Sequence, residues 1–321
     1  MHAIQVSEHG GPEVLRWVEV AQPRIGPGQL LVETQGVGVN YIDIYFRTGQ
    51  YPQQTPYIPG SEGTGVVAAV GAEVTEFVVG DRVAWAAAPG SYADKVAVDE
   101  TAAVKVPDGV EPTVAAAALL QGMTAHYLVE SVFRPESGDP VLIHAGAGGV
   151  GLLLTQMAVA KGARVITTVS TDAKEQLSRE AGASEVLRYG DDLAARVRDL
   201  TDGVGVAAVY DGVGASTFEA GLASLRVRGT MALFGAASGP VPPFDPQRLN
   251  PAGSLWLTRP SLGAYTRDRA EFLWRATDVF NGIATGALNF RIGATYPLAD
   301  AAQAHTDLAG RKTTGSIVLL P

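Results

Sequence analysis

Cysteine is absent from this chain of 321 residues. Its absence excludes disulfides, thiolate nucleophiles, iron–sulfur clusters and every zinc site with a cysteine ligand. Long apolar runs are missing too, because stretches such as residues 114–120 are far shorter than the ~18 residues that cross a bilayer. Residues 1–20 contain three glutamates and no basic segment followed by an apolar one. We therefore expect no signal peptide, no membrane partner and a cytoplasmic location.

Basic residues are fewer than acidic ones. Lys and Arg number 24 against 33 Asp and Glu, the net charge is −9, and consecutive basic residues form no block. Nucleic acid is therefore not an expected partner. Hydrophobic residues make up 46% of the chain, which is typical of a folded protein rather than a disordered one. The length predicts two domains or one large one.

The order of predicted elements suggests how those domains are arranged. Residues 3–106 alternate short β-rich runs with Gly, Pro and Asp, which predicts a compact β-rich domain. From residue 141 to residue 234, strands alternate with helical segments, which predicts a parallel doubly wound sheet. A proline-rich loop, a strand at 254–258 and a helix at 266–286 follow. We expect the last strand, 315–320, to rejoin the first domain.

Residues 146–151 form the pattern G-x-G-x-x-G between a predicted strand and a predicted helix. Glycines permit a tight turn and close approach to a pyrophosphate, and the helix N-terminus contributes N–H groups and partial positive charge. The pattern predicts a dinucleotide site; a glycine-rich turn without a ligand is the alternative. The candidate residues of the loop are Gly146, Gly148, Gly149, Val150 and Gly151.

The next strand indicates which dinucleotide binds. In an NAD site an acidic residue is expected ~20 residues after the glycines, but residues 164–170 read R-V-I-T-T-V-S. Lys174, in the first turn of the following helix, favours a nearby anion, although a solvated lysine is the alternative. Arg188 and Tyr189 could reach the same phosphate, and Asp172 is expected to be a helix N-cap. The sequence therefore favours NADPH over NADH.

Several motifs spread over nearly the whole chain carry a family resemblance. They are H-G-G-P-E-V-L (9–15), G-V-N-Y-I-D-I-Y (38–45), G-S-E-G-T-G-V-V (60–67), V-G-D-R-V (79–83), Q-G-M-T-A (121–125), H-A-G-A-G-G-V-G (144–151), Y-D-G-V-G (210–214) and T-R-P-S-L (258–262). In these segments the chain resembles the zinc-free quinone oxidoreductases of the medium-chain dehydrogenase/reductase superfamily, the zeta-crystallin-like NADPH:quinone reductases.

The resemblance implies an α/β fold with two domains. Residues 1–123 and 263–321 would form a GroES-like, β-rich substrate and catalytic domain, and residues 124–262 a Rossmann domain with a doubly wound parallel sheet that binds NADPH. The cofactor would lie in the cleft between them. The family resemblance also implies a homodimer, in agreement with the exposed edge strand predicted at 254–258.

The resemblance also implies roles for individual residues. Asn40 and Thr124 would lie by the nicotinamide. Tyr41, Tyr45 and Tyr51 belong to the segment expected to face the cleft, where a tyrosine could stack on a flat acceptor or donate a hydrogen bond to its oxygen. Tyr45 is the first candidate for that contact; a packing role is the alternative for each tyrosine and is favoured for Tyr41. The remaining implied cofactor contacts are Ser170, Lys174, Tyr189, Asp211, Val213, Phe234, Gly235 and Arg311.

One departure from the metal-dependent relatives bears on the reaction. In the zinc alcohol dehydrogenases the segment G-H-E-x-x-G supplies a histidine ligand, whereas here Ser61 stands in that place. We expect no metal site. Without a Lewis acid, alcohol oxidation is hard to support, whereas a quinone accepts hydride more readily. The prediction is an NADPH-dependent, zinc-independent quinone reductase; the alternatives are an enone or alkenal reductase and a non-catalytic NADPH-binding protein.

Overall fold

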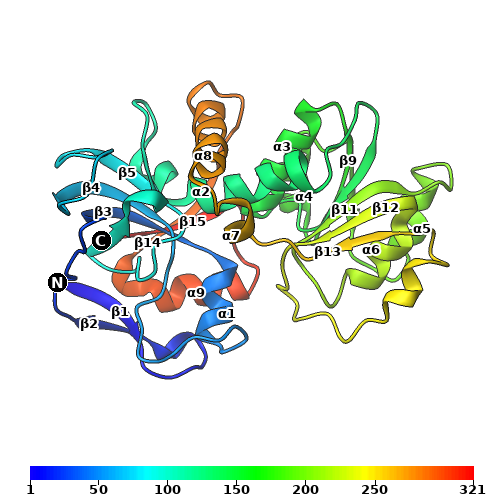
Figure 1. Ribbon diagram of the computed structural model, residues 1–321. Helices are drawn as coiled ribbons and strands as arrows, with labels where there is room; N and C mark the ends of the chain where they lie inside the picture. The colour runs from blue at the N-terminus through cyan, green and yellow to red at the C-terminus, as the bar shows by residue number, and fades with distance from the viewer. The chain divides into compact units, whose positions relative to one another are not determined.

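The computed structural model describes residues 1–321, which divide into two compact units. Unit 1 contains Met1–Met123 and Thr266–Pro321, and unit 2 contains Thr124–Tyr265. The chain therefore leaves unit 1, forms unit 2 and returns (Figure 1). No helix combines the length and apolar character that crossing a membrane requires.

The centre of unit 1 is a seven-stranded sheet ordered β14-β15-β3-β4-β5-β7, with β6 paired to β3. These strands are β3 (Gln29–Val39), β4 (Gly63–Val70), β5 (Arg82–Trp85), β6 (Lys95–Asp99), β7 (Ala103–Lys105), β14 (Ile292–Pro297) and β15 (Ser316–Leu320). A separate antiparallel pair consists of β1 (His2–Val6) and β2 (Leu15–Glu19). Because β15 pairs antiparallel with β3, the end of the chain lies in a sheet formed largely by its beginning.

Strand β3 contributes to two of the hydrophobic clusters of unit 1. Leu30 and Val32, near its start, pack in a cluster with the wholly buried Trp85. Val37 and Val39, near its end, pack in another cluster that includes Ile317 of β15. The alternation of these apolar residues along the strand places them on the buried face at each end.

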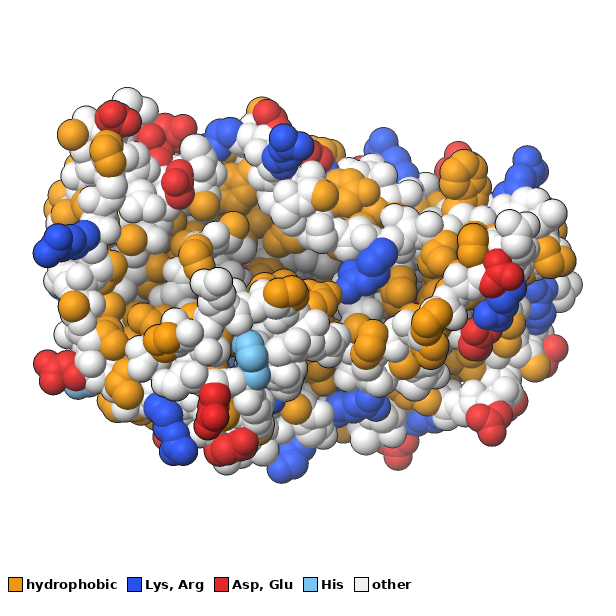
Figure 2. All heavy atoms as spheres, turned by 60° about the horizontal axis from the view of Figure 1, so that its bottom comes forward, with side chains coloured by type: hydrophobic (Ala, Val, Ile, Leu, Met, Phe, Trp, Pro, Cys, Tyr) orange, Lys and Arg blue, Asp and Glu red, His pale blue; other side chains and the backbone are white.

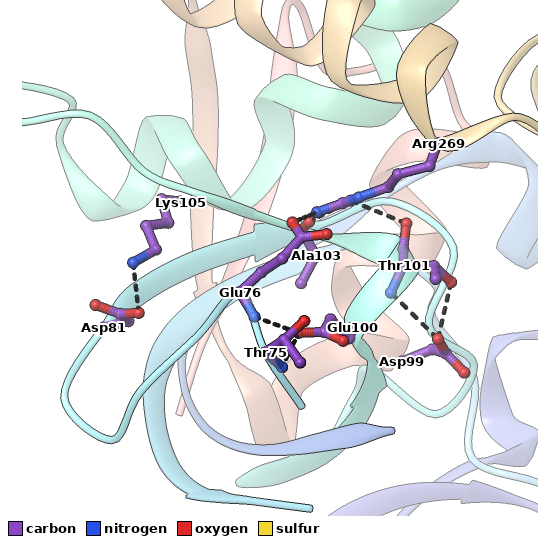
Figure 3. A network of polar contacts seen from close by, with 9 residues as sticks. All are labelled: Thr75, Glu76, Asp81, Asp99, Glu100, Thr101, Ala103, Lys105 and Arg269. Carbon is purple, nitrogen blue, oxygen red and sulfur yellow. Dashed lines mark hydrogen bonds and ion pairs between the residues drawn. The ribbon is translucent and has the colours of Figure 1, made fainter. Parts of the chain in front are cut away.

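Four helices belong wholly or mainly to unit 1: α1 (Tyr41–Arg47), α2 (Pro112–Tyr127), α8 (Arg269–Ala284) and α9 (Ala301–Ala309). Helix α8 begins just after the chain returns from unit 2. Its first residue, Arg269, donates to the carbonyl oxygens of Thr101 (3.0 Å) and Ala103 (2.7 Å) and pairs with Glu76 at 2.6 Å (Figure 3). These contacts fix the returning segment to the β-rich part of the unit.

Unit 2 contains a six-stranded, wholly parallel sheet ordered β10-β9-β8-β11-β12-β13. Helices α3 and α4 contact β8, β9 and β10, whereas α6 contacts β11 and β12 and packs against α5 (Figure 1). The elements are β8 (Pro140–Ile143), α3 (Gly149–Ala160), β9 (Arg164–Val169), α4 (Asp172–Glu180), β10 (Glu185–Arg188), α5 (Leu193–Asp199), β11 (Val206–Asp211), α6 (Phe218–Ser224), β12 (Leu225–Leu233), β13 (Trp256–Thr258) and the short α7 (Leu262–Tyr265). This strand order reverses direction between β8 and β11, where doubly wound sheets bind their ligands.

The predicted α/β class with a parallel doubly wound sheet is confirmed. The predicted strand at 254–258 is present as β13 but is shorter, and the predicted helix at 266–286 is α8. Sequence reasoning missed β14 and α9. In β14 every residue is half-buried or exposed, so this edge strand has no run of buried apolar residues for a pattern to detect.

Candidate functional site

In unit 2 the glycine-rich loop connects β8 to α3, at the reversal point of the sheet. Its N–H groups begin the turn: Gly146 N–H donates to Thr168 O (3.0 Å), and Gly148 N–H donates to Ala145 O (2.9 Å). Gly148 is the N-cap of α3, which begins at Gly149. The first N–H groups of a helix have no partner within the helix and point out of its end. The loop therefore presents backbone donors rather than charged side chains.

Two of the loop glycines are required by close packing. A Cβ atom on Gly151 would lie 2.2 Å from Ala145 O, and one on Gly146 would lie 2.6 Å from the Cβ atom of Thr167. A Cβ atom on Gly148 would meet only Ala145 O, at 3.3 Å. Gly148 thus leaves open space beside the helix N-terminus, the kind of cradle that a phosphate group would fill.

Tyr189 lies against the same loop. Ala145 N–H donates to the hydroxyl of Tyr189 at 3.0 Å, and the Tyr189 ring stacks on that of His144 with centroids 6.3 Å apart. The His144 ring is buried, and burial lowers its pKa, so this histidine is neutral and structural. The structure therefore brings one predicted adenosine-phosphate contact, Tyr189, to the glycine-rich loop.

The start of α4 differs from the prediction in one respect. Thr171, not Asp172, is the N-cap, because its hydroxyl accepts from Lys174 N–H at 3.3 Å. Asp172 instead accepts from Arg188 (2.6 Å), which also pairs with Glu175 at 2.8 Å. This guanidinium is thus neutralised by two carboxylates, a long-range pairing that the sequence does not encode locally.

Two predicted cofactor contacts, Ser170 and Lys174, lie near the start of α4. Ser170 directly follows β9 and is exposed, while Lys174 is half-buried in the first turn of α4. Strand β9 ends at Val169, so the acidic residue that an NAD site would have at this strand end is absent, as the sequence indicates.

Asp211 and its neighbours form a tight turn at the end of β11. The buried Asp211 carboxylate accepts from Val213 N–H (2.7 Å), Gly214 N–H (3.0 Å) and the Thr217 hydroxyl (2.7 Å). The Asp211 side chain therefore holds the turn from within.

The end of β12 packs directly on that turn. Phe234 N–H donates to Asp211 O at 2.8 Å, and a Cβ atom on Gly235 would lie 2.5 Å from Gly212 O. Val213 is buried and Phe234 is half-buried. The structure thus brings these four predicted residues, Asp211, Val213, Phe234 and Gly235, together in one part of unit 2.

In unit 1, Asn40 lies in a chain of buried side chains. Its Nδ2 donates to Oε2 of Glu62 (2.7 Å), and its Oδ1 accepts from Nε2 of Gln121 (3.1 Å). Oε1 of Glu62 accepts from Leu120 N–H (2.6 Å), and Oε1 of Gln121 accepts from the Ser316 hydroxyl (2.6 Å). The Asn40 amide is therefore held at both ends, by groups that are themselves anchored.

This chain of hydrogen bonds depends on a glycine in β3. A Cβ atom on Gly38 would lie 2.5 Å from Oε2 of Glu62 and 2.8 Å from Ala116 O. Burial raises the pKa of Glu62 to about 8, and the nearby Asp43 adds to the rise, although the hydrogen bonds from Asn40 and Leu120 oppose it. Glu62 thus titrates within the range in which enzymes are assayed.

A second chain of hydrogen bonds starts at the backbone of Asn40. Its N–H donates to Asp43 (2.9 Å), whose carboxylate also accepts from the Tyr92 hydroxyl (3.0 Å). Nε2 of His305 contacts that hydroxyl (3.0 Å), and Nδ1 of His305 contacts the Arg47 guanidinium (3.1 Å). Because Arg47 can only donate, the tautomer that fits carries its proton on Nε2. We call Asp43, Tyr92, His305 and Arg47 the α1 relay.

Every side chain of the α1 relay is buried. Burial raises the pKa of Asp43 to about 7 and lowers that of His305 to about 3, the latter with help from Arg47. The histidine is therefore neutral at physiological pH. The relay joins α1 to α9 and fixes the position of this segment.

The three tyrosines of the α1 region form an aromatic group. The Tyr45 ring lies 5.9 Å from that of Tyr41 and 5.1 Å from that of Tyr51, measured between centroids. Tyr45 is buried, with 6% of its surface exposed, whereas Tyr41 and Tyr51 are half-buried. Burial raises the pKa of the Tyr41 hydroxyl, and the Arg311 guanidinium, which is hydrogen-bonded to Tyr41, opposes that rise. The structure thus brings predicted residues from both ends of the chain together around α1.

Comparisons with known proteins bear on the family. Residues 26–108 match the model of the alcohol dehydrogenase GroES-like domain, and residues 149–273 match that of the zinc-binding dehydrogenases. The chain is 43% identical to a quinone oxidoreductase of Pseudomonas aeruginosa, with 99% of each chain covered. The chain belongs to the quinone oxidoreductase branch of the medium-chain dehydrogenase/reductase superfamily.

Two further members of this superfamily are informative. A mycobacterial protein solved in complex with NADPH is 58% identical and superposes with a TM-score of 0.98 over 100% of both chains. A 2-haloacrylate reductase of Burkholderia is 38% identical, with 99% of this chain and 98% of the relative covered. The family is thus shared by proteins named for different acceptors.

In this chain, no group of three or more His, Cys, Asp or Glu side chains lies close enough together to hold a metal ion. Thr124 is buried in α2, one turn after Gln121. Sequence reasoning did not identify Gln121, Tyr92, His305 or Ser316 as partners of the Asn40 region. Gly38 was the one local signal, because a glycine in a strand marks a close approach.

Proposed function

We propose that the protein is an NADPH-dependent, zinc-independent quinone reductase. Similarity to a named quinone oxidoreductase over 99% of the chain is the observation that carries the proposal. The missing acidic residue at the end of β9 and the mycobacterial NADPH complex support the phosphorylated cofactor.

The residues of unit 2 fit a dinucleotide. The open space beside Gly148 and the N-terminus of α3 would hold the pyrophosphate, with Gly146, Gly149, Val150 and Gly151 shaping the loop. Ser170, Lys174 and Tyr189 would surround the 2′-phosphate. For Arg311, a cofactor contact is what the family resemblance implies. Asp211, Val213, Phe234 and Gly235 would line the remaining cofactor surface through their backbone and the Phe234 ring. When bound, NADPH supplies the hydride.

Unit 1 would receive the acceptor. The aromatic group of Tyr45 and Tyr51 fits a flat ring, and a tyrosine hydroxyl can donate to an acceptor oxygen. Asn40 and Thr124 would orient the reacting partners, Asn40 through an amide that its neighbours hold fixed. Positioning alone contributes strongly to such a reaction, because the acceptor is already electrophilic.

Steady-state oxidation of NADPH and NADH with 1,4-benzoquinone and a naphthoquinone tests the proposal. We expect turnover with quinones and preference for NADPH. Absence of turnover with every quinone would overturn it.

An enone reductase is the second candidate, and the 2-haloacrylate reductase among the relatives is the observation that favours it. Assays with acrolein-type acceptors and 2-haloacrylates, run beside the quinones, separate the two by their kcat/KM values. The third alternative is a non-catalytic NADPH-binding protein, structural or RNA-binding, and an RNA shift assay at low salt tests its RNA-binding form. On the face in Figure 2, acidic and basic side chains are interspersed, which does not favour a nucleic-acid surface.

We also propose a homodimer formed along β13. This strand is at the edge of the unit 2 sheet, and Trp256 on it and Val227 on the neighbouring β12 are 68% and 69% exposed. An exposed apolar edge strand invites pairing with a second copy. Sedimentation at several concentrations tests this, and a monomer at all of them would refute it.

A cytoplasmic location remains a prediction, for which cell fractionation is the test.

A further inference from the structure

The chain of hydrogen bonds through Asn40 has a direction. The Ser316 hydroxyl donates to Gln121, Gln121 donates to Asn40, and Asn40 donates to Glu62. Glu62 also accepts from Leu120 N–H, so its two oxygens end the chain as acceptors. A carboxylate can accept at both oxygens and donate at neither, and it therefore dictates which way every amide in the chain faces.

The same side chains can form a complete chain in the opposite direction. If Oε2 of Glu62 carries a proton, it can donate to Oδ1 of a rotated Asn40 amide. Nδ2 of Asn40 then donates to a rotated Gln121, whose Nε2 donates to the Ser316 hydroxyl, a group that both donates and accepts. Leu120 N–H keeps its acceptor in either case. The Asp43 N–H, which the Asn40 side chain caps in the observed direction, keeps the backbone oxygen of Asn40 as its acceptor at 3.0 Å. The side chains of the chain thus remain hydrogen-bonded to one another in both directions, which differ mainly in what Asn40 presents to its surroundings.

We propose that Glu62 is a positioning residue whose carboxylate sets the direction of this chain and thereby fixes which atom of Asn40 faces the reacting groups. The proposal rests on the proposed function for the role of Asn40. Asn40 itself contacts the reacting groups, and Glu62 acts through it.

The surroundings of Glu62 favour such a change at moderate pH. Burial raises its pKa to about 8, and Asp43 of α1 adds to the rise. Tyr92 is the other titratable group close to it, and burial together with Asp43 keeps the pKa of that phenol well above its usual value. From α2, backbone N–H groups approach Glu62 itself, and the Gln121 side chain joins the chain of hydrogen bonds through Asn40. From β15, Ser316 reaches that chain, and neither Gln121 nor Ser316 titrates in this range. Within this chain, Glu62 is thus the group whose proton is gained or lost.

The variant Glu62→Gln changes the direction of the chain of hydrogen bonds but keeps the chain complete. The fixed donor Leu120 N–H requires the oxygen of the introduced amide on its side, which places the NH₂ of that amide against Asn40 and holds the reversed direction at every pH. In the wild-type protein we expect kcat/KM with a quinone to rise about tenfold as pH increases through about 8. The variant should have the low value throughout, with an NADPH dissociation constant within about threefold of wild type.

The matched control is Glu33→Gln, the same substitution at an exposed carboxylate of β3 that pairs with Lys95. It should retain the wild-type profile. A Glu62→Gln variant that keeps either the wild-type activity or the wild-type pH dependence would overturn the proposal.

Side-chain amide NMR provides a readout that does not depend on turnover or on the folding of a variant. In the wild-type protein, the side-chain amide signals of Asn40 and Gln121 should shift together with the Glu62 carboxyl carbon, at one midpoint. Amide signals that do not follow Glu62 would refute the reversal even in an active enzyme. If the amides follow Glu62 but no quinone is reduced, the proposed function has failed and the reversal stands.

Discussion

The two candidate regions are built from different parts of the polypeptide. In unit 2 the surroundings of the glycine-rich loop are largely backbone: N–H groups at the start of α3, with a turn that Asp211 holds from within. In unit 1 the surroundings of Asn40 are buried side chains contributed by distant segments. A backbone site tolerates little added volume, whereas a side-chain network is sensitive to each proton and hydroxyl.

The strongest test of the comparison adds one methyl group to the loop. Gly151→Ala places a Cβ atom 2.2 Å from the backbone oxygen of Ala145, and no flexible side chain can relieve the contact. We expect a loss of about 3 kcal/mol or more in the free energy of unfolding, and loss of measurable NADPH binding. Urea denaturation and fluorescence titration measure the two effects.

Gly148→Ala is the control, because its Cβ atom would lie 3.3 Å from the same oxygen. The unfolding free energy should change by about 1 kcal/mol or less, the cost of a poorer N-cap. Equal losses in the two variants would contradict the assignment of distinct roles to these glycines.

The second test concerns the charge buried in the α1 relay. The pKa of Asp43 is raised by burial from 3.8 to about 7, so between these values the folded protein holds a proton that the unfolded chain has lost. Stability must then fall as pH rises through this range, by up to ~1.4 kcal/mol per pH unit for this group. Asp43→Asn should remove that slope, since one oxygen can still accept from both Asn40 and Tyr92.

Urea unfolding at pH 5 to 7.5 measures this slope, and the difference between variant and wild type cancels the opposite contribution of His305. The variant should gain stability relative to wild type as pH increases. The exposed Asp191→Asn serves as control. A difference that is constant with pH would show that the Asp43 charge is not the cause.

The third test removes one hydroxyl from the α1 relay. Tyr92→Phe leaves Asp43 without one donor and His305 without one partner, in a fully buried site. We expect a loss of about 2 kcal/mol in the free energy of unfolding. Tyr57→Phe is the matched control, because the buried hydroxyl of Tyr57 has no hydrogen-bond partner. Its removal should cost little, and similar losses in both variants would show that the relay adds nothing specific.

The smallest expected effect is a change in the affinity for NADPH relative to NADH. Lys174→Ala should weaken NADPH binding about tenfold and leave NADH nearly unchanged, because only NADPH carries the 2′-phosphate. Arg179→Ala, at the exposed end of the same helix, is the control. Equal weakening of both cofactors would place the phosphate elsewhere. Titrations at one fixed salt concentration are required, since screening alters such contacts.

The sequence predicted the parts of the molecule that depend on local order. A strand, a glycine turn and a helix follow one another directly, so the α3 loop could be located from its spacing, as could the alternating elements of unit 2. The Asn40 surroundings could not be located this way. Ser316 lies 195 residues from Gln121, and His305 lies 258 residues from Arg47, so only the folded chain brings them together. Arg188 was likewise not predictable, because its pairing with Asp172 and Glu175 joins two elements.

The pairing of β15 with β3 has a consequence for how the protein is made. Synthesis proceeds from the N-terminus, so residues 1–123 and all of unit 2 leave the ribosome before β15 and α9 exist. Unit 2 is continuous in sequence and can fold as soon as it emerges. Until α9 and β15 emerge, Gln121 lacks Ser316, and Arg47 and Tyr92 lack His305. Unit 1 must therefore be the last to mature, and C-terminal truncations should spare unit 2 while leaving unit 1 incomplete.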